Sequence, residues 1–280
     1  MNTVQLYDSV CSEISGSVVS RYSTSFSIGI RSLHPRFRAP IKAIYGFVRF
    51  ADEIVDTFHD HDKRNLLFRF RQDTCSAMAD GISLNPILHS FQRTANTYGI
   101  DASLIDPFLD SMAMDLDRSV HDAGTFATYI LGSAEVVGLM CLRVFCEGDE
   151  ATYERLKPAA MRLGSAFQKV NFLRDLQDDH DALGRTYFPG IDVDHMDDTM
   201  KKRAEADMAA DFKAALEGIR ELPAGSRFGV YTAYLYYRAL FRKIQGLSAS
   251  KIMHERIRIG KRAKMRLLTT SYLKHSFGIL

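Results

Sequence analysis

The stretch "AIYGFVRFADEIVDTF", residues 43–58, carries two patterns at the same time. Most of its residues are apolar and recur at helical spacing, which predicts an α-helix with a buried face. Its polar residues form a stripe at offsets of 0, 4, 7 and 11, namely Tyr45, Arg49, Asp52 and Asp56. Because apolar residues flank this stripe on both sides, the two aspartates are predicted to line a cavity inside a helical bundle.

A second stripe of the same kind occurs in "FQKVNFLRDLQDD", residues 167–179. Gln168, Asn171, Asp175 and Asp179 follow one another at offsets of 0, 3, 7 and 11. Like charges one turn apart destabilise a helix by about 0.2–0.5 kcal/mol, so a counter-charge or bulk water must offset them. A single pair of this kind is usually a solvated acidic face, but two pairs with apolar flanks favour a buried site.

The chemistry of the two stripes predicts a metal and a phosphate ligand. Carboxylates that face one another across a cavity repel, and a divalent cation removes that repulsion. Carboxylate and amide oxygens suit Mg²⁺, with Mn²⁺ as the alternative ion. Arg49 and Arg174 add planar donors that match phosphate oxygens. Together with the apolar surroundings, these groups predict a diphosphate with a long apolar tail as the substrate.

Helical periodicity extends along nearly the whole chain, and strand alternation is rare, which predicts an all-α protein with one domain over residues 1–280. Pro40 is expected to open a helix in its first turn, and Asp60 to cap the next one, with Gly81 just beyond its end. The expected helices cover about residues 40–58, 60–79, 85–98, 102–119, 125–146, 150–180, 199–221, 228–246 and 250–270.

Composition narrows the class further. The chain has 280 residues, is 46% hydrophobic and carries a net charge of +2, which gives no indication of a nucleic-acid partner. No apolar run of about 18 residues and no signal peptide are recognised, so the expected location is the cytoplasm. The cysteines lack zinc-site spacing and are expected to be free thiols: Cys11, Cys75, Cys141 and Cys146.

Two long signatures resemble the squalene/phytoene synthase family, the head-to-head prenyl synthases, and within it a bacterial-type phytoene synthase. The first is "YSTSFSIGIRSLHPRFRAPIKAIYGFVRFADEIVD", from Tyr22 to Asp56. The second is "GSAFQKVNFLRDLQDDHDALGRTYFP", from Gly164 to Pro189, and it is the more specific of the two. The resemblance implies an isoprenoid-synthase-type helical bundle around a central cavity, with the two aspartate motifs on opposite walls.

The resemblance also implies an activity. Two allylic prenyl diphosphates would be joined through a cyclopropylcarbinyl diphosphate, which then ionises and rearranges. Because the sequence has no GxGxxG motif, NADPH is not expected, and two geranylgeranyl diphosphates would give phytoene for carotenoid biosynthesis. The alternatives are a dehydrosqualene or squalene synthase that uses farnesyl diphosphate and a non-catalytic homologue that binds lipid or assists assembly. A terpene cyclase fits the arginines and the GRxYxP segment less well.

The resemblance assigns roles residue by residue. The expected Mg²⁺ ligands and catalytic acids are Asp52, Asp56, Asp175 and Asp179, with Asn171 as a further metal ligand. The residues expected to bind or orient the diphosphate are Ser25, Tyr45, Arg49, Gln168, Arg174, Arg185 and Tyr187. Two aromatic residues are expected to face the reacting carbons as catalytic residues, Phe26 and Tyr129. Asp115 and Asp117 receive no role.

Three features depart from the family pattern or extend beyond it. Glu135 stands where glycine is usual, and it is expected to turn outward or to find a partner. Lys251 stands where some members have tyrosine, and no role is assigned to it. The basic C-terminal segment, residues 251–275, is expected to attach peripherally to an anionic membrane leaflet, with a solvated basic helix as the alternative.

Overall fold

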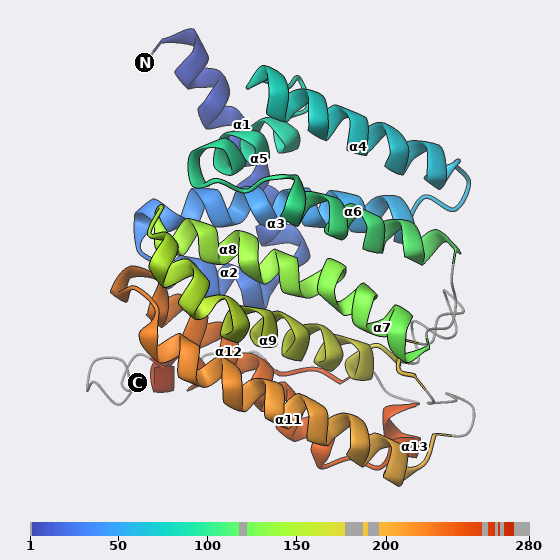
Figure 1. Cartoon of the computed structure of the whole chain (residues 1–280). Helices are drawn as coiled ribbons and strands as arrows, with labels where there is room; N and C mark the ends of the chain where they lie inside the picture. Colours follow the sequence, from blue (N-terminus) through green and yellow to red (C-terminus); the bar gives the residue numbers. More distant parts are fainter. Residues whose placement is uncertain are drawn as a thin grey trace.

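The computed structural model describes residues 2–117, 122–176, 187–189, 196–253, 257–260, 263 and 266–271. Within these ranges the chain is a bundle of α-helices without strands, as the sequence predicts (Figure 1). The long helices run side by side in layers, and several of them enclose a cavity. The all-α fold class is therefore confirmed.

The first two helices, which the sequence analysis did not list, are α1 (Thr3–Tyr22) and α2 (Thr24–Arg31). Asn2 caps α1 and forms a capping box with Gln5, a signal that was present in the sequence. Ser23 separates the two helices, and its Oγ accepts a hydrogen bond from the Phe26 backbone N–H at 3.1 Å. This single-residue break turns the chain so that α2 contributes to the cavity wall.

The central helix α3 (Pro35–Asp56) begins earlier than predicted. Pro35 occupies the first turn, where a missing N–H costs nothing, and Pro40 lies inside the helix instead. The expectation that Pro40 opens the helix is therefore wrong. Phe37 and Phe47 on α3 are fully buried, so the helix forms part of the core as well as part of the cavity wall.

Three further helices cover one side of α3: α4 (Lys63–Asp80), α5 (Pro86–Tyr98) and α6 (Ala102–Asp117). The N-cap of α4 is Asp62, whose side chain accepts from the Asn65 N–H at 3.0 Å, so the prediction of Asp60 is wrong. The predicted end at Gly81 is confirmed, because Gly81 adopts a left-handed φ of 69°.

The expected helix 125–146 is interrupted by a π-turn. It consists of α7 (Ala123–Ile130), η1 (Leu131–Glu135) and α8 (Val136–Cys146). Gly132 in this turn lets the chain approach α6 closely, since a Cβ there would lie 2.3 Å from the Pro107 carbonyl oxygen. Among the described residues, Ala123–Cys146 is the one helical run apolar and long enough to cross a membrane, and 61% of its most apolar window is buried inside the bundle.

Helix α9 (Glu150–Arg174) packs lengthwise against α11 (Asp198–Glu221). A buried carboxylate joins them: Asp211 accepts from Arg162 at 2.9 Å, from Ser165 at 2.9 Å and from Lys169 at 2.7 Å. This network fixes the rotation of α9 about its axis. The expected helix 150–180 ends at Arg174 in the structure.

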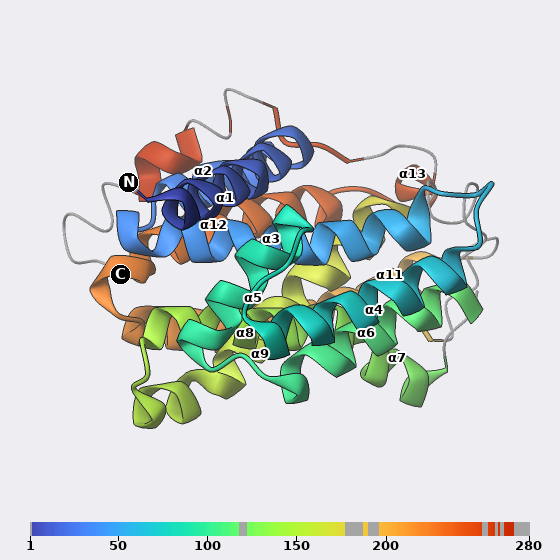
Figure 2. The ribbon, with the colours of Figure 1, turned by 90° about the horizontal axis from the view of Figure 1, so that it is seen from above.

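After α11 the chain forms α12 (Ala224–Gln245) and the short α13 (Ala249–Ile252). The expected helix 250–270 is not continuous, because residues 257–260 are not helical, although 266–271 are (Figure 2). Ile257 is buried, with 3% of its surface exposed. This part of the segment therefore packs against the bundle instead of lying on the surface as an amphipathic helix.

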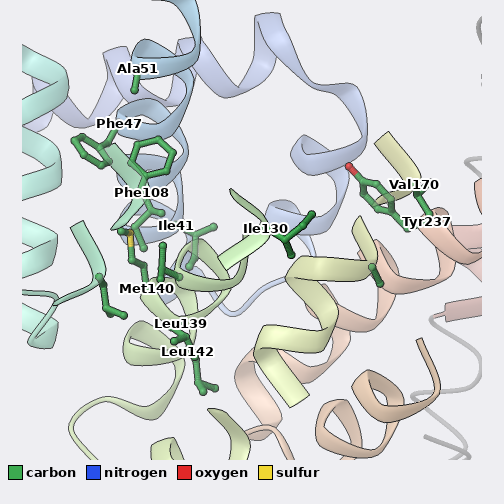
Figure 3. Packing of buried hydrophobic residues seen from close by; sticks show 14 of the residues in the cluster. Ile41, Phe47, Ala51, Phe108, Ile130, Leu139, Met140, Leu142, Val170 and Tyr237 are labelled. Atoms are coloured by element: carbon green, nitrogen blue, oxygen red, sulfur yellow. The ribbon is translucent and has the colours of Figure 1, made fainter. Parts of the chain in front are cut away.

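The core follows the central helix. Phe47 stacks on Phe91 with ring centroids 3.8 Å apart and lies 5.4 Å from Phe108. Figure 3 shows Phe47 and Phe108 next to each other, with Met140 below them at the level of α8. These rings anchor α3 to α5 and α6, and this packing holds the polar stripe of α3 toward the cavity.

Candidate active site

One cavity of about 970 Å³ lies among the helices, which is at the upper end of the range for small-molecule sites. Every predicted site residue that the structure describes lines it: Ser25, Phe26, Tyr45, Arg49, Asp52, Asp56, Tyr129, Gln168, Asn171, Arg174, Asp175 and Tyr187. The two remaining predicted residues, Asp179 and Arg185, lie outside the described residues. The structure thus gathers residues that are more than a hundred positions apart in the chain, and their chemical roles remain predictions.

On the α3 wall, Asp52 and Asp56 lie one helical turn apart. Arg49 is paired with Glu53 one turn away, and another of its nitrogens lies 3.9 Å from an Asp52 oxygen. The Arg49 guanidinium also lies over the Tyr22 ring, 4.5 Å from its centroid. The arginine is therefore held beside the aspartates by contacts on two sides.

Asp52 does not behave as an ordinary carboxyl. Burial and the neighbouring Asp56 carboxylate raise its pKa to about 8, and Arg49 only partly opposes this effect. With no cation bound, the α3 wall therefore favours the protonated form of Asp52. The α3 wall is a place where additional positive charge would be favourable, as the sequence predicted from the repulsion between the aspartates.

The α9 wall is built differently. Asp175 is not inside the helix but is its C-cap residue, with its N–H bonded to the Asn171 carbonyl at 2.9 Å. The Arg174 guanidinium grips the Asp175 carboxylate through two nitrogens, and the Nε–Oδ1 distance is 2.9 Å. Both side chains are largely buried, with 22% and 16% of their surfaces exposed. Arg174, a predicted diphosphate-binding residue, therefore already forms an ion pair with Asp175, a predicted metal ligand.

The donor set fits a hard divalent cation. The Asn171 Oδ1 atom is buried and accepts no hydrogen bond from the part of the chain that the structure describes. An orphaned amide oxygen next to carboxylates is costly unless a cation or water satisfies it. Within the described ranges, however, no three Asp, Glu, His or Cys side chains converge closely enough to hold a metal alone. Further ligands would have to come from water or substrate oxygens.

Tyr129, Asp115 and Tyr187 form a group that the sequence analysis only partly recognised. The Tyr129 hydroxyl donates to Asp115 Oδ2 at 2.9 Å, and its ring lies 5.2 Å from that of Tyr187. Burial and the Asp115 carboxylate raise the pKa of Tyr129 well above its usual value. Asp115, which was assigned no role, lines the cavity. Its signal was the spacing "MAMDLD", which places one acid on the inner face of α6.

Aromatic rings line the cavity next to the charged groups. Phe26 lies 5.8 Å from Tyr45 and 6.0 Å from Tyr237, and Phe167 stacks on Tyr237 at 3.9 Å. Burial raises the pKa of Tyr45 and of Tyr237 to about 12 in each case, so both phenols stay neutral. Sequence reasoning missed Tyr237, since α12 carries several tyrosines and nothing in its pattern singles out this one.

Glu135 turns away from the cavity, as expected for a carboxylate at that position. It is half-buried on η1 and does not line the cavity. Burial raises its pKa, while the charges of Arg162 and Lys169 oppose the shift. These two residues belong to the network that joins α9 to α11, and their positive charges favour the ionised form of Glu135.

Comparisons with known proteins agree with this architecture. A phytoene synthase from Daucus carota is 28% identical over 94% of this chain and 70% of its own length. One from the bacterium Pseudescherichia vulneris is 27% identical over 81% and 80%, and a presqualene diphosphate synthase from Sinorhizobium fredii is 30% identical over 61% and 60%. A crystal structure of a dehydrosqualene synthase in complex with ligand superposes with a TM-score of 0.79 at 20% identity, covering 96% of this chain and 97% of that one.

The cavity of this all-α bundle gathers acids and arginines in a lining that is otherwise largely apolar. The sequence model of squalene/phytoene synthase matches residues 19–263. The chain belongs to the squalene/phytoene synthase family of prenyltransferase-type enzymes, whose members act on prenyl diphosphates, and its relatives include phytoene synthases from a plant and from a bacterium.

Proposed function

We propose that the protein condenses two geranylgeranyl diphosphates head to head and releases phytoene by proton loss. The observation that carries this proposal is one large cavity, in which Asp52, Asp56 and Asp175 lie with Arg49 and Arg174 while the rest of the lining is largely apolar. Such a site can hold a diphosphate at its charged part and a prenyl chain along its apolar part.

The first step breaks the bond between C1 of one prenyl chain and its diphosphate oxygen, and the electron pair leaves with the diphosphate. The double bond of the second chain then attacks C1, and loss of a proton closes the cyclopropane ring. Arg49 and Arg174 would hold the departing diphosphate, with Ser25, Tyr45 and Gln168 as hydrogen-bonding neighbours. For Arg174 this requires that the substrate share the guanidinium with Asp175.

We propose Mg²⁺, or Mn²⁺, as the cofactor. Asp52, Asp56, Asn171 and Asp175 would hold it together with Asp179, which lies outside the described residues. The ion would supply the positive charge that stabilises the leaving diphosphate. The orphaned Asn171 Oδ1 and the raised pKa of Asp52 both support this assignment, because a bound cation would satisfy the first and favour the ionised form of the second.

The aromatic residues would protect the carbocation. A cation near a ring face gains about 0.5–2 kcal/mol, and these rings are poor nucleophiles. Phe26 and Tyr129 both line the cavity and would face the reacting carbons, and Tyr237 lies beside Phe26. The neutral phenol of Tyr129, hydrogen-bonded to Asp115, would neither quench the cation nor lose its proton readily. Exclusion of water from the filled cavity would prevent early quenching of the carbocation by water.

Two alternatives use the same site. Farnesyl diphosphate would give a thirty-carbon product, and the structural similarity to a dehydrosqualene synthase is compatible with it. Arrest at the cyclopropyl intermediate is the activity named for the presqualene diphosphate synthase relative. We do not expect NADPH to take part, since proton loss ends the reaction without a reductant.

Product analysis tests the proposal. Purified protein is incubated with Mg²⁺ and either farnesyl or geranylgeranyl diphosphate, with and without NADPH. We expect a forty-carbon hydrocarbon from geranylgeranyl diphosphate that does not depend on NADPH and that disappears when EDTA is added. No thirty- or forty-carbon product under any of these conditions would refute the enzymatic function.

We also propose that the protein binds peripherally to the cytoplasmic membrane face, because its product has no polar group and must leave into lipid. Eight Lys and Arg residues lie in the segment 251–275, and each is worth about 1 kcal/mol near an anionic surface. Reversing the charges of Lys261, Arg262 and Lys264, which lie outside the described residues, should release the protein from anionic vesicles. Unchanged partition onto those vesicles would contradict membrane attachment through this segment.

A further inference from the structure

Tyr237 of α12 lies between two other helices of the cavity wall. Its ring stacks on Phe167 of α9, with the centroids 3.9 Å apart and the ring planes inclined by 15°. The Phe26 ring of α2 lies 6.0 Å away from it. Only 4% of the Tyr237 surface is exposed. Packing on two sides therefore fixes the position of this ring, and with it the position of its hydroxyl oxygen.

The sequence of α12 explains why this side chain reaches α9. Gly229, Ala233 and Tyr237 recur every fourth residue, share one face of α12 and all line the cavity. A Cβ at Gly229 would lie 2.8 Å from the Gly29 carbonyl oxygen, so the backbones of α12 and α2 approach closely there. About two turns further along the same face, the large side chain of Tyr237 extends to α9.

Asn171 lies one helical turn beyond Phe167 on α9, so both residues contact the same tyrosine. The Asn171 side chain hydrogen-bonds to Tyr237. Its Oδ1 atom is buried and accepts no hydrogen bond from the residues that the structure describes. The amide nitrogen is therefore the atom that donates to the Tyr237 hydroxyl oxygen, and Oδ1 remains for a ligand in the cavity.

The orientation of this amide decides what it offers to a cation. The oxygen has lone pairs that a hard cation can use, whereas the NH₂ group only donates and would repel it. When the Asn171 oxygen faces the cavity, its NH₂ group faces α12, where a buried donor without an acceptor would be costly. The hydroxyl of Tyr237 removes that cost, because its oxygen accepts the hydrogen bond.

We propose that Tyr237 is a positioning residue for the cation site, which presents the Asn171 oxygen to Mg²⁺ by accepting a hydrogen bond from the Asn171 amide nitrogen. Tyr237 does not itself bind the ion. Groups that orient a metal ligand from behind in this way commonly change metal affinity 10–100-fold. This inference rests on the proposed function, because it presupposes that Asn171 binds the cation. It gives the phenol hydroxyl a role that the ring alone cannot fill.

The first test removes only the hydroxyl. Tyr237→Phe keeps the ring that stacks on Phe167, and we expect its affinity for Mg²⁺ to fall at least about tenfold. The measurement is a calorimetric titration of the full chain with Mg²⁺ in the presence of saturating inorganic pyrophosphate. The matched control is Tyr234→Phe, a buried tyrosine of the same helix that does not line the cavity, and it should bind Mg²⁺ as the wild type does.

The second test asks whether Tyr237 acts through Asn171. In an Asn171→Leu background there is no amide to orient, so removal of the phenol hydroxyl should have no further consequence for the ion. We expect Tyr237→Phe to lower the Mg²⁺ affinity at least about tenfold in the wild-type background, but less than about threefold in the Asn171→Leu background. A purely structural role of Tyr237 would give the same loss in both backgrounds.

Kinetics give an independent measurement. In Tyr237→Phe, the Mg²⁺ concentration for half-maximal product formation should rise at least about tenfold, while the rate at saturating Mg²⁺ stays within about threefold of wild type. This split is expected because the substitution weakens binding of the ion and leaves the ring next to Phe26 in place. A fall in the saturated rate with an unchanged Mg²⁺ requirement would overturn the positioning role.

The outcomes separate this inference from the proposed function. Wild-type Mg²⁺ affinity in Tyr237→Phe, or an equal loss in the two backgrounds, overturns the positioning role and leaves the proposed cation site intact. A wild-type protein that binds no Mg²⁺ in the presence of pyrophosphate overturns the proposed cofactor, and this inference with it.

Discussion

The two walls of the cavity hold their described aspartates in different ways. On α3, Asp52 lies within the helix and Asp56 is its last residue, and Arg49 is held beside them by Glu53. On α9 the helix ends at Arg174, and Asp175 is its cap, gripped by that arginine. The α3 wall is therefore placed by helical periodicity alone, whereas the α9 wall depends on where the helix stops.

This difference has an electrostatic consequence. Asp52 has a carboxylate neighbour and a raised pKa, so additional positive charge would stabilise the α3 wall. Asp175 already has a cationic partner in Arg174. We infer that the α3 wall determines the affinity for the cation. On the α9 wall, the diphosphate would have to replace Asp175 as the partner of Arg174, so this wall determines how readily the diphosphate binds there.

The largest effect should come from removing a carboxylate on either wall. We expect Asp52→Ala and Asp175→Ala each to lower the rate of product formation at least about 10³-fold, because charge on the leaving diphosphate would no longer be stabilised. Circular dichroism and the melting temperature should remain close to wild type, since neither side chain is part of the core. Turnover within tenfold of wild type in either variant would show that its wall is dispensable.

The next largest effect on product formation should come from weakening the ion pair between Arg174 and Asp175. Arg174→Lys keeps the charge but loses the two-nitrogen grip, and we expect product formation to fall about 10–100-fold. Arg162→Lys provides a control on the same helix, because Arg162 contacts Asp211 through one nitrogen and does not line the cavity. If the two variants have equal activity, the internal ion pair has no function in the site.

The pH dependence of cation binding should distinguish the walls. Because Asp52 has a pKa of about 8 and must lose its proton to bind a cation, Mg²⁺ affinity should weaken about tenfold per unit as the pH falls below 8. Calorimetric titration between pH 6 and 8 measures this slope. Asp52→Asn should bind more weakly and with a flat pH profile, whereas Asp175→Asn should retain the slope. An unchanged slope in Asp52→Asn would assign the proton to another group.

The smallest effect concerns stability. Asn171→Leu removes an orphaned oxygen and one hydrogen bond to Tyr237, so we expect the free energy of unfolding to stay within about 1 kcal/mol of wild type. Mg²⁺ affinity should nevertheless fall. Ser15→Ala is the control, because its buried Oγ also accepts no hydrogen bond in the described chain but lies away from the cavity. Unaltered Mg²⁺ affinity in Asn171→Leu would remove it from the ligand set.

The sequence by itself determined the fold class and most of the polar lining of the cavity. Apolar spacing specifies helices, and on a helix the same spacing decides which polar residues share a face, so Asp52 and Asp56 could be placed without coordinates. Long signatures then named the family. Local signals were less reliable at boundaries: Pro40 and Asp60 were chosen over Pro35 and Asp62, because several residues near each helix start can serve.

Only the tertiary structure decided what each polar group meets. That Arg174 binds Asp175, that Tyr129 donates to Asp115 and that Glu135 lies near the charges of Arg162 and Lys169 are relations that helical spacing cannot give. The depth of the cavity is also tertiary, because Gly218 and Gly138 set how closely α8, α9 and α11 approach. Periodicity is a property of one helix, whereas partners and distances depend on how several helices pack, and this is why the sequence predicted the residues of the site but not their partners or its length.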